Sequence, residues 1–233
     1  MPELLEVKIW GDMACFTRPE MKVERVSYEV MTPSAARGIL ESIFWKPEFQ
    51  WQIKEIWVLN PIRHFSILRN EITSRQSIKA AAAKGGNYYA DAGKNRAQRH
   101  TLALKNVAYV IRARQKLAQH TKDPLVKYKE QFLRRINKGQ YFHHPYLGCR
   151  EFSACFGPLD GSEKPISFSD DLGLLLFDMV YKPHPKGKIK FLKHDGKDPE
   201  LIKGETHPVF FQAKLVNGIL KVPDELYNKG GHA

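Results

Sequence analysis

The stretch DPLVKYKEQFLRRINKGQYFHHPYLGCREFSACF, residues 123–156, predicts a helix, a tight turn and a strand in succession. Asp123 suits the N-cap and Pro124 suits the first helical turn, where an amide hydrogen is not needed. Gly139 is typical of a residue that ends a helix. Apolar side chains recur at helical spacing and form one face, namely Leu125, Tyr128, Phe132 and Ile136.

The rest of this helix is basic, and the segment after it is rich in rings. Cations lie off the apolar face at Lys127, Arg134, Arg135 and Lys138. Residues 140–150 then mix aromatic side chains with two histidines and an arginine. Cations beside flat rings favour RNA, because the cations pair with phosphates and the rings stack on unpaired bases.

Composition agrees with a globular protein that has a polyanionic partner. The chain has 233 residues, of which 42% are hydrophobic, and 37 Lys and Arg against 25 Asp and Glu give a net charge of +12. A basic protein with solvated lysines is the alternative. No window approaches the roughly 18 apolar residues of a membrane span, and the first residues do not resemble a signal peptide. We therefore expect a soluble cytoplasmic protein without a membrane partner.

Cysteine usage predicts neither a disulfide framework nor a zinc site. The chain has three cysteines, Cys15, Cys149 and Cys155, without CxxC spacing. Each lies in an apolar segment, so we expect buried free thiols.

The order of the first elements predicts an α+β fold. A strand at 4–16 precedes a helix at 32–45, which has Thr32 as its cap and Pro33 inside it. Strands at 51–59 and 102–117 alternate in hydrophobicity, and the helix and strand of 123–156 follow. This order predicts a ferredoxin-like (RRM-like) βαββαβ domain over 1–156.

Two further segments complete the prediction. Residues 73–98 lack an apolar period and predict a mobile basic loop, which is either functional or simply solvated. Strands at 171–181 and 188–193 and a hairpin at 209–222 predict a small antiparallel β subdomain over 157–233. Asn217 and Gly218 suit the type I′ turn of that hairpin.

The residues favour RNA cleavage without a metal or another cofactor. No metal-binding or phosphate-loop motif is present in the sequence. Attack by a ribose 2′-OH needs a base, an acid and a cation for the phosphorane. Tyr128, Lys127 and Lys129 crowd the start of the helix and suit these roles. Packing is the alternative for Tyr128, and ordinary surface charge is the alternative for the lysines. His143 and His144 would alternate on a strand, so at most one would face a given groove.

Two motifs carry a resemblance to a known family. TPSAARGILESIFWKPEF (32–49) and KGQYFHHPYLGCREF (138–152) resemble the CRISPR-associated Cas5d (also Cas5c) family of subtype I-C, and the resemblance covers about residues 4–222. It implies a ferredoxin-like domain, a small β-rich C-terminal domain and metal-independent cleavage of precursor CRISPR RNA in its repeat hairpin. The product would carry a 2′,3′-cyclic phosphate. The protein would stay on the 5′ handle in a surveillance complex with Cas7 and Cas8 subunits.

The family's site residues carry over unevenly. Some relatives have a tyrosine before Trp-Lys-Pro, and Phe44 stands there in this chain. Their Lys-His pair matches about Tyr128 and Lys129, with Lys127 adjacent. We expect Tyr128 to transfer a proton and Lys127 or Lys129 to stabilise the phosphate, with His100 as a weaker catalytic candidate. The expected RNA-binding residues are Arg37, Trp45, Lys46, Arg134, Arg135, Lys138 and Arg150.

Three alternatives remain open at this point. A non-catalytic RNA-binding subunit that caps the 5′ handle would explain Phe44 in the tyrosine position. Nonspecific binding of double-stranded DNA would explain the charge alone. Arg150 could form an ion pair with Glu151 instead of binding RNA.

Overall fold

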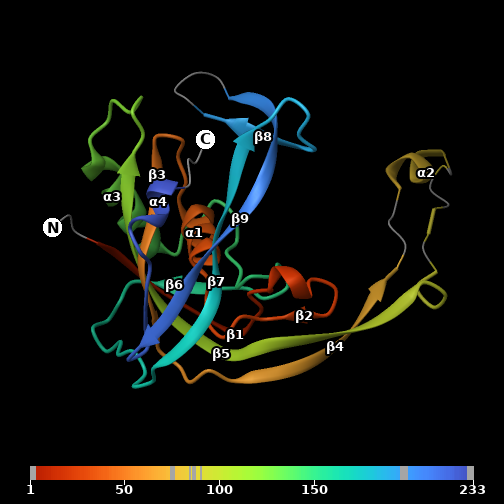
Figure 1. The fold of residues 1–233 in the computed structure, drawn as a ribbon, viewed down its shortest axis with the longest axis horizontal. Helices are drawn as coiled ribbons and strands as arrows, with labels where there is room; N and C mark the ends of the chain where they lie inside the picture. Colours follow the sequence, from red (N-terminus) through yellow and green to blue (C-terminus); the bar gives the residue numbers. More distant parts are fainter. Residues whose placement is uncertain are drawn as a thin grey trace.

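The computed structural model describes residues 4–73, 77–83, 85, 88–89, 91–194 and 199–229. Within these ranges one sheet of ten strands dominates the molecule (Figure 1), and its main path runs β6-β1-β5-β3-β10-β9-β7. The strands are β1 (Leu5–Ala14), β2 (Arg25–Val26), β3 (Phe49–Val58), β4 (His64–Ile72), β5 (Arg96–Leu117), β6 (Cys155–Gly157), β7 (Asp170–Pro183), β8 (Ile189–Lys193), β9 (Glu200–Val216) and β10 (Ile219–Lys221). A short 3-10 helix, η1 (Pro19–Met21), precedes β2.

Strand β5 organises the sheet. Its 22 residues pair with β1 and β3 on its two sides, then with β4 along its first half, and briefly with β2. β4 and the first half of β5 extend away from the rest of the molecule as a long arm (Figure 1). The second half of β5 lies between β1 and β3, and its β-branched side chains, such as Val110 and Ile111, are buried on the faces of the sheet.

The predicted ferredoxin-like βαββαβ fold class is wrong. The sheet does not end after four strands, because β10 pairs with β3 at Ile219 and Trp57 and leads on to β9 and β7. The prediction followed the local order of strands and helices, whereas pairing between residues far apart in sequence decides the size of a sheet. The structure is mainly a large antiparallel sheet with few helices.

Helix α1 (Pro33–Ile43) confirms the first predicted helix. Thr32 caps it by accepting a hydrogen bond from the Ala35 amide at 3.2 Å. Its apolar face is buried through Ala36, Ile39, Leu40 and Ile43.

Helix α3 (Leu125–Lys138) confirms the second, with a correction at its start. The N-cap is Pro124 rather than Asp123, whose carboxylate pairs with Lys127 instead. Gly139 ends the helix in the left-handed conformation, at φ 62°. Tyr128, Phe132 and Ile136 are buried as the spacing predicted.

The region after α3 differs from its prediction. Only β6 is a strand there, and the residues between Gly139 and β6 form bends and turns. His143 and His144 are both exposed, so the expected alternation on a strand is wrong. Of the three cysteines, Cys15 is buried, Cys149 is half-buried and Cys155 is exposed, so the prediction of burial fails for Cys155.

The predicted loop at 73–98 has structure at both ends. Helix α2 (Ile78–Ala83) lies near the tip of the arm, and β5 begins at Arg96. The remainder of that prediction falls partly outside the described residues.

The C-terminal strands and hairpin are confirmed. Asn217 and Gly218 have φ values of 48° and 74°, as a type I′ turn requires. A four-residue helix, α4 (Leu226–Lys229), follows. The division into parts 1–156 and 157–233 stays a prediction. Within the described ranges, no helix combines the length and the apolar character needed to cross a bilayer.

Candidate functional site

A groove forms where three connections of the fold meet. Two of them join elements, namely the turn between α1 and β3 and the link between β5 and α3. The third is the segment that follows the end of β8. Two cavities of about 670 and 320 Å³ adjoin there. Both are lined by Pro47, His120 and His194. The smaller one also reaches Tyr128, Asp123 and Lys122.

The walls of the groove are held by hydrogen bonds to the backbone. The carbonyl of Glu48 accepts from the Ala118 amide at 2.8 Å and from the Thr121 hydroxyl at 2.5 Å. These bonds fix the link before α3 against the start of β3. The Trp51 indole donates to the Phe44 carbonyl at 2.9 Å and ties β3 to the end of α1. The connections that form the groove are therefore held in place by hydrogen bonds to backbone carbonyls.

Tyr128 lies at the floor of the groove. Its ring packs against Phe49 at a centroid distance of 5.4 Å, and its hydroxyl lies 3.5 Å from Asp123 Oδ2. Burial raises the pKa of Tyr128, and the negative charges of Glu48 and Asp123 raise it further. The phenol therefore stays protonated near neutral pH and can donate a proton rather than accept one.

The two neighbouring lysines lie on different sides of α3's first turn. Lys127 is exposed, and its ammonium group lies 2.6 Å from Asp123 Oδ2. This hydrogen bond raises the pKa of Lys127 and keeps the group charged. Lys129 is half-buried. Of the predicted catalytic residues, the structure thus brings Tyr128 and Lys127 together around one carboxylate.

His100 is not brought to this groove. It is exposed on the arm, pairs with Leu68 of β4, and lies 3.4 Å from the Ser66 hydroxyl through Nδ1. His100 lies 17 residues before Leu117, the last residue of β5, which lines the groove. At about 3.3 Å per residue, this separation is roughly 55 Å along the strand.

The predicted RNA-binding residues divide into two groups. Five are exposed, and two of these border cavities. Trp45 lines the groove, and Trp45 and Arg150 line a third cavity of about 830 Å³ with Phe142 and His143. Lys46, Arg134 and Lys138 are exposed around the ends of α1 and α3.

The second group consists of arginines that hold the fold together. Arg37 forms a two-pronged ion pair with Asp178 of β7, at 2.7 and 2.8 Å. Arg135 donates to the Ile43 carbonyl and lies over the Phe44 ring. The suggested pair of Arg150 with Glu151 is replaced by another arrangement, because Glu151 pairs with Arg25 and Arg69.

Sequence reasoning missed two residues of the groove. His120 is half-buried at the point where the two cavities adjoin. Glu48 lines the smaller cavity, and its Oε2 atom is buried with no hydrogen-bond partner in the described part of the chain. Both lie in connections without periodicity, so no spacing pattern could single them out. No cluster of three His, Cys, Asp or Glu suited to a metal occurs among the described residues.

Comparison with known proteins assigns the family. The model of the CRISPR-associated protein family Cas5d matches residues 4–223. A protein of Thermus thermophilus named CRISPR pre-crRNA endoribonuclease Cas5d is 47% identical over 225 residues, covering 97% of this chain and 93% of its own. A protein of the same name from Mannheimia succiniciproducens is 41% identical and covers 96% of each chain.

Solved structures agree with the fold. A crystal structure described as a CRISPR-associated protein superposes with a TM-score of 0.62 at 20% identity, over 96% of this chain and 93% of the other. A functionally uncharacterized Streptococcus mutans protein, SMU1763c, superposes with a TM-score of 0.61 at 20% identity, over 96% and 94%. With a family model that spans nearly the whole sequence and two relatives above 40% identity, this chain belongs to the Cas5d family of CRISPR-associated proteins.

Proposed function

We propose that this protein is an endoribonuclease that cuts precursor CRISPR RNA in its repeat hairpin without a metal ion. The names of its two curated relatives support RNA cleavage. The observation that carries the location of the chemistry is the groove, which gathers a phenol, two histidines and lysines beside a basic helix. These are the groups that 2′-OH attack needs.

In the proposed reaction the ribose 2′-oxygen attacks the adjacent phosphorus. The new bond from the 2′-oxygen to phosphorus forms, the bond from phosphorus to the 5′-oxygen breaks, and a 2′,3′-cyclic phosphate and a 5′-hydroxyl result. His120 takes the proton from the 2′-OH. Tyr128, which its surroundings keep protonated, donates to the leaving oxygen or to the phosphorane. Lys127, with Lys129 as the predicted alternative, stabilises the phosphorane charge.

After cleavage the protein stays on the 5′ handle in a type I-C surveillance complex in the cytoplasm, with Cas7 and Cas8 subunits as partners. Trp45 and Arg150 support this part of the proposal, since an exposed ring and a cation border one cavity. A ring there can stack on an unpaired base while the guanidinium contacts a phosphate.

A non-catalytic subunit that caps the handle is the second candidate. Phe44 favours it, because this residue is buried at the end of α1 and carries no group that exchanges a proton. In that case the groove would bind RNA and leave it intact.

Cleavage of the host's own repeat RNA in EDTA distinguishes the two candidates. We expect cleavage of the all-RNA hairpin and none of a hairpin with a single 2′-deoxy at the scissile nucleotide. Tight binding to both without cleavage would establish the capping subunit. Cleavage only with added metal would overturn the mechanism.

Histidine variants then test the site. His120→Gln is expected to slow cleavage by about 10²–10⁴-fold, the usual contribution of a positioned acid or base. His207→Gln is the matched control, since His207 is exposed on β9 and lies 3.7 Å from Glu205, outside the groove. If His120→Gln kept full activity and His100→Gln lost it, the catalytic site would lie on the arm and not in the groove.

A further inference from the structure

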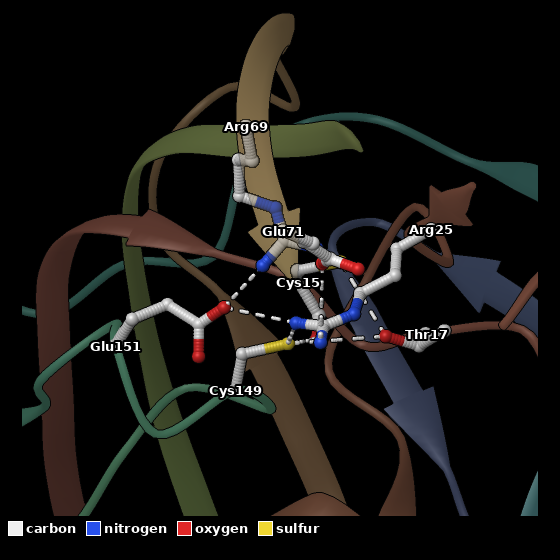
Figure 2. Close-up of polar contacts among 7 residues, drawn as sticks. All are labelled: Cys15, Thr17, Arg25, Arg69, Glu71, Cys149 and Glu151. Carbon is white, nitrogen blue, oxygen red and sulfur yellow. Dashed lines mark hydrogen bonds and ion pairs between the residues drawn. The ribbon is translucent and has the colours of Figure 1, made fainter. Parts of the chain in front are cut away.

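Two cysteines that are 134 residues apart in sequence meet beside the end of β1 (Figure 2). The Cys149 sulfur lies 3.6 Å from the Cys15 carbonyl, and the two thiols contact the same Thr17 hydroxyl, at 3.5 Å from Cys15 and 3.9 Å from Cys149. The Cys15 amide also donates to the Leu147 carbonyl at 3.0 Å. The backbones that carry the two thiols are thus already in contact.

Gly148 explains how the approach is possible. Its φ is +84°, and a Cβ on it would lie 2.1 Å from the Cys15 carbonyl oxygen. Only glycine allows the loop to lie this close to β1. The glycine at position 148 therefore allows the loop that carries Cys149 to pack directly against the backbone of Cys15.

A cation lies next to one of the two sulfurs. Arg25 of β2 places Nη1 3.4 Å from Cys149 Sγ and 2.9 Å from Glu151 Oε1. Glu151 in turn holds Arg69 of β4 at 2.6 Å, and Glu71 lies 3.9 Å from Arg25. Figure 2 shows the Arg25 guanidinium between the Cys149 sulfur and these carboxylates.

We propose that Cys149 and Cys15 form a reactive thiol pair, which a peroxide converts to a disulfide. In the first step the Cys149 thiolate sulfur attacks one peroxide oxygen, the O–O bond breaks, and the leaving hydroxide takes a proton to give water. Cys149 becomes a sulfenic acid. In the second step the Cys15 sulfur attacks the Cys149 sulfur, the S–O bond breaks, and the hydroxide takes the Cys15 proton. Two thiols lose two electrons, and the peroxide becomes two waters.

The electrostatics support Cys149 as the attacking group. The interaction with the Cys15 thiol lowers the pKa of Cys149, and Thr17 and Arg25 lower it further, whereas burial and Glu151 act in the opposite direction. The same interaction between the two thiols, together with burial, raises the pKa of Cys15. Cys149 is half-buried, so a small oxidant can reach it, while Cys15 is buried behind it. These are the properties of an attacking thiol with a resolving partner.

Tryptic mapping of the full-length protein tests the proposal directly. Cleavage after Lys8, Lys22, Lys138 and Arg150 places each of the three cysteines on a separate peptide. After treatment with hydrogen peroxide we expect the peptide of Cys15 joined to the peptide of Cys149, and its release by a thiol reductant. Peroxide that leaves these two peptides unlinked, or that links either one to the Cys155 peptide instead, would overturn the proposal.

Alkylation by iodoacetamide at pH 5 tests the cause of reactivity, because this pH lies below the pKa of Cys149, which its surroundings lower to about 6. Cys149 is expected to react faster than Cys155, although Cys155 is more exposed. Arg25→Met should slow the reaction of Cys149, and Glu151→Gln should accelerate it. The expected change is about three- to fourfold for each unit of pKa change, because the thiolate fraction changes tenfold while thiolate nucleophilicity changes in the opposite sense. The two variants move the rate in opposite directions, which unfolding would not do. Faster reaction of Cys155, or equal rates in both variants, would refute the assignment.

Discussion

Arg37 was predicted to bind RNA, whereas its contacts predict a structural role that a substitution can measure. Its guanidinium joins α1 to β7 through Asp178 and reaches Glu41 at 2.7 Å. Burial alone would lower the pKa of Arg37, but Glu41 and Asp178 outweigh it and hold the pKa above its ordinary value. Arg37→Met removes the cation and keeps an unbranched chain of similar length.

The expected loss of stability follows from the unpaired carboxylate of Asp178 that Arg37→Met leaves behind. The Asp178 side chain is 4% exposed, so Arg37→Met leaves a buried carboxylate without its cation. Breaking a buried pair in this way costs about 3–5 kcal/mol. Because the Arg37 side chain is 27% exposed, we expect the lower end, about 3 kcal/mol.

A double-mutant cycle in urea measures this coupling. Asp178→Leu on top of Arg37→Met removes the stranded charge, and we expect the double variant to be more stable than Arg37→Met alone. Lys46→Met is the control for loss of a cation near the same helix, since Lys46 is exposed, and it should change stability by less than about 0.5 kcal/mol.

Two results would refute the reasoning. One is a loss of stability below about 1 kcal/mol in Arg37→Met, the range typical of an exposed ion pair. The other is a fall in the affinity of Arg37→Met for repeat RNA with no change in stability, which would show that Arg37 binds RNA.

Substitutions at three further positions test local features. Thr32→Ala should cost about 1 kcal/mol in urea unfolding, because the amide at the start of α1 loses its acceptor, and Thr32→Ser should retain most of the stability. Gly148→Ala should cost more than about 2 kcal/mol, since its Cβ would strike the Cys15 carbonyl. Gly161→Ala is its matched control, because its φ is +86° with nothing within 4 Å; it should cost only the conformational strain of about 1 kcal/mol. Equal losses in the two glycine variants would show that the close approach contributes nothing.

Several elements could be predicted from sequence because their causes are local. Thr32 and Pro33 begin α1, Gly139 ends α3, and the Asn217–Gly218 turn joins β9 to β10. Each depends on a cap, a fixed φ or a positive φ within a few residues. The apolar face of α3 follows from spacing alone.

The candidate site was only partly predictable for the opposite reason. Tyr128 and Lys127 lie on a helix with a clear pattern, so the sequence indicated them. His120 and Glu48 lie in connections, and only the meeting of those connections places them beside Tyr128. His100 was the weaker catalytic candidate in the sequence, and β5 places it on the arm, away from the groove.

The sequence by itself determined the family, the basic RNA-directed character and most of the strands and helices, because motifs, charge and periodicity are carried by neighbouring residues. Only the tertiary structure decided that the strands join in one sheet, that Arg37 and Arg135 are used inside the fold, and that Cys15 meets Cys149. Pairing of strands, burial of charges and the contact of Cys149 with Cys15 depend on residues more than 90 positions apart. Such contacts are fixed by packing of the whole chain, which no local pattern encodes.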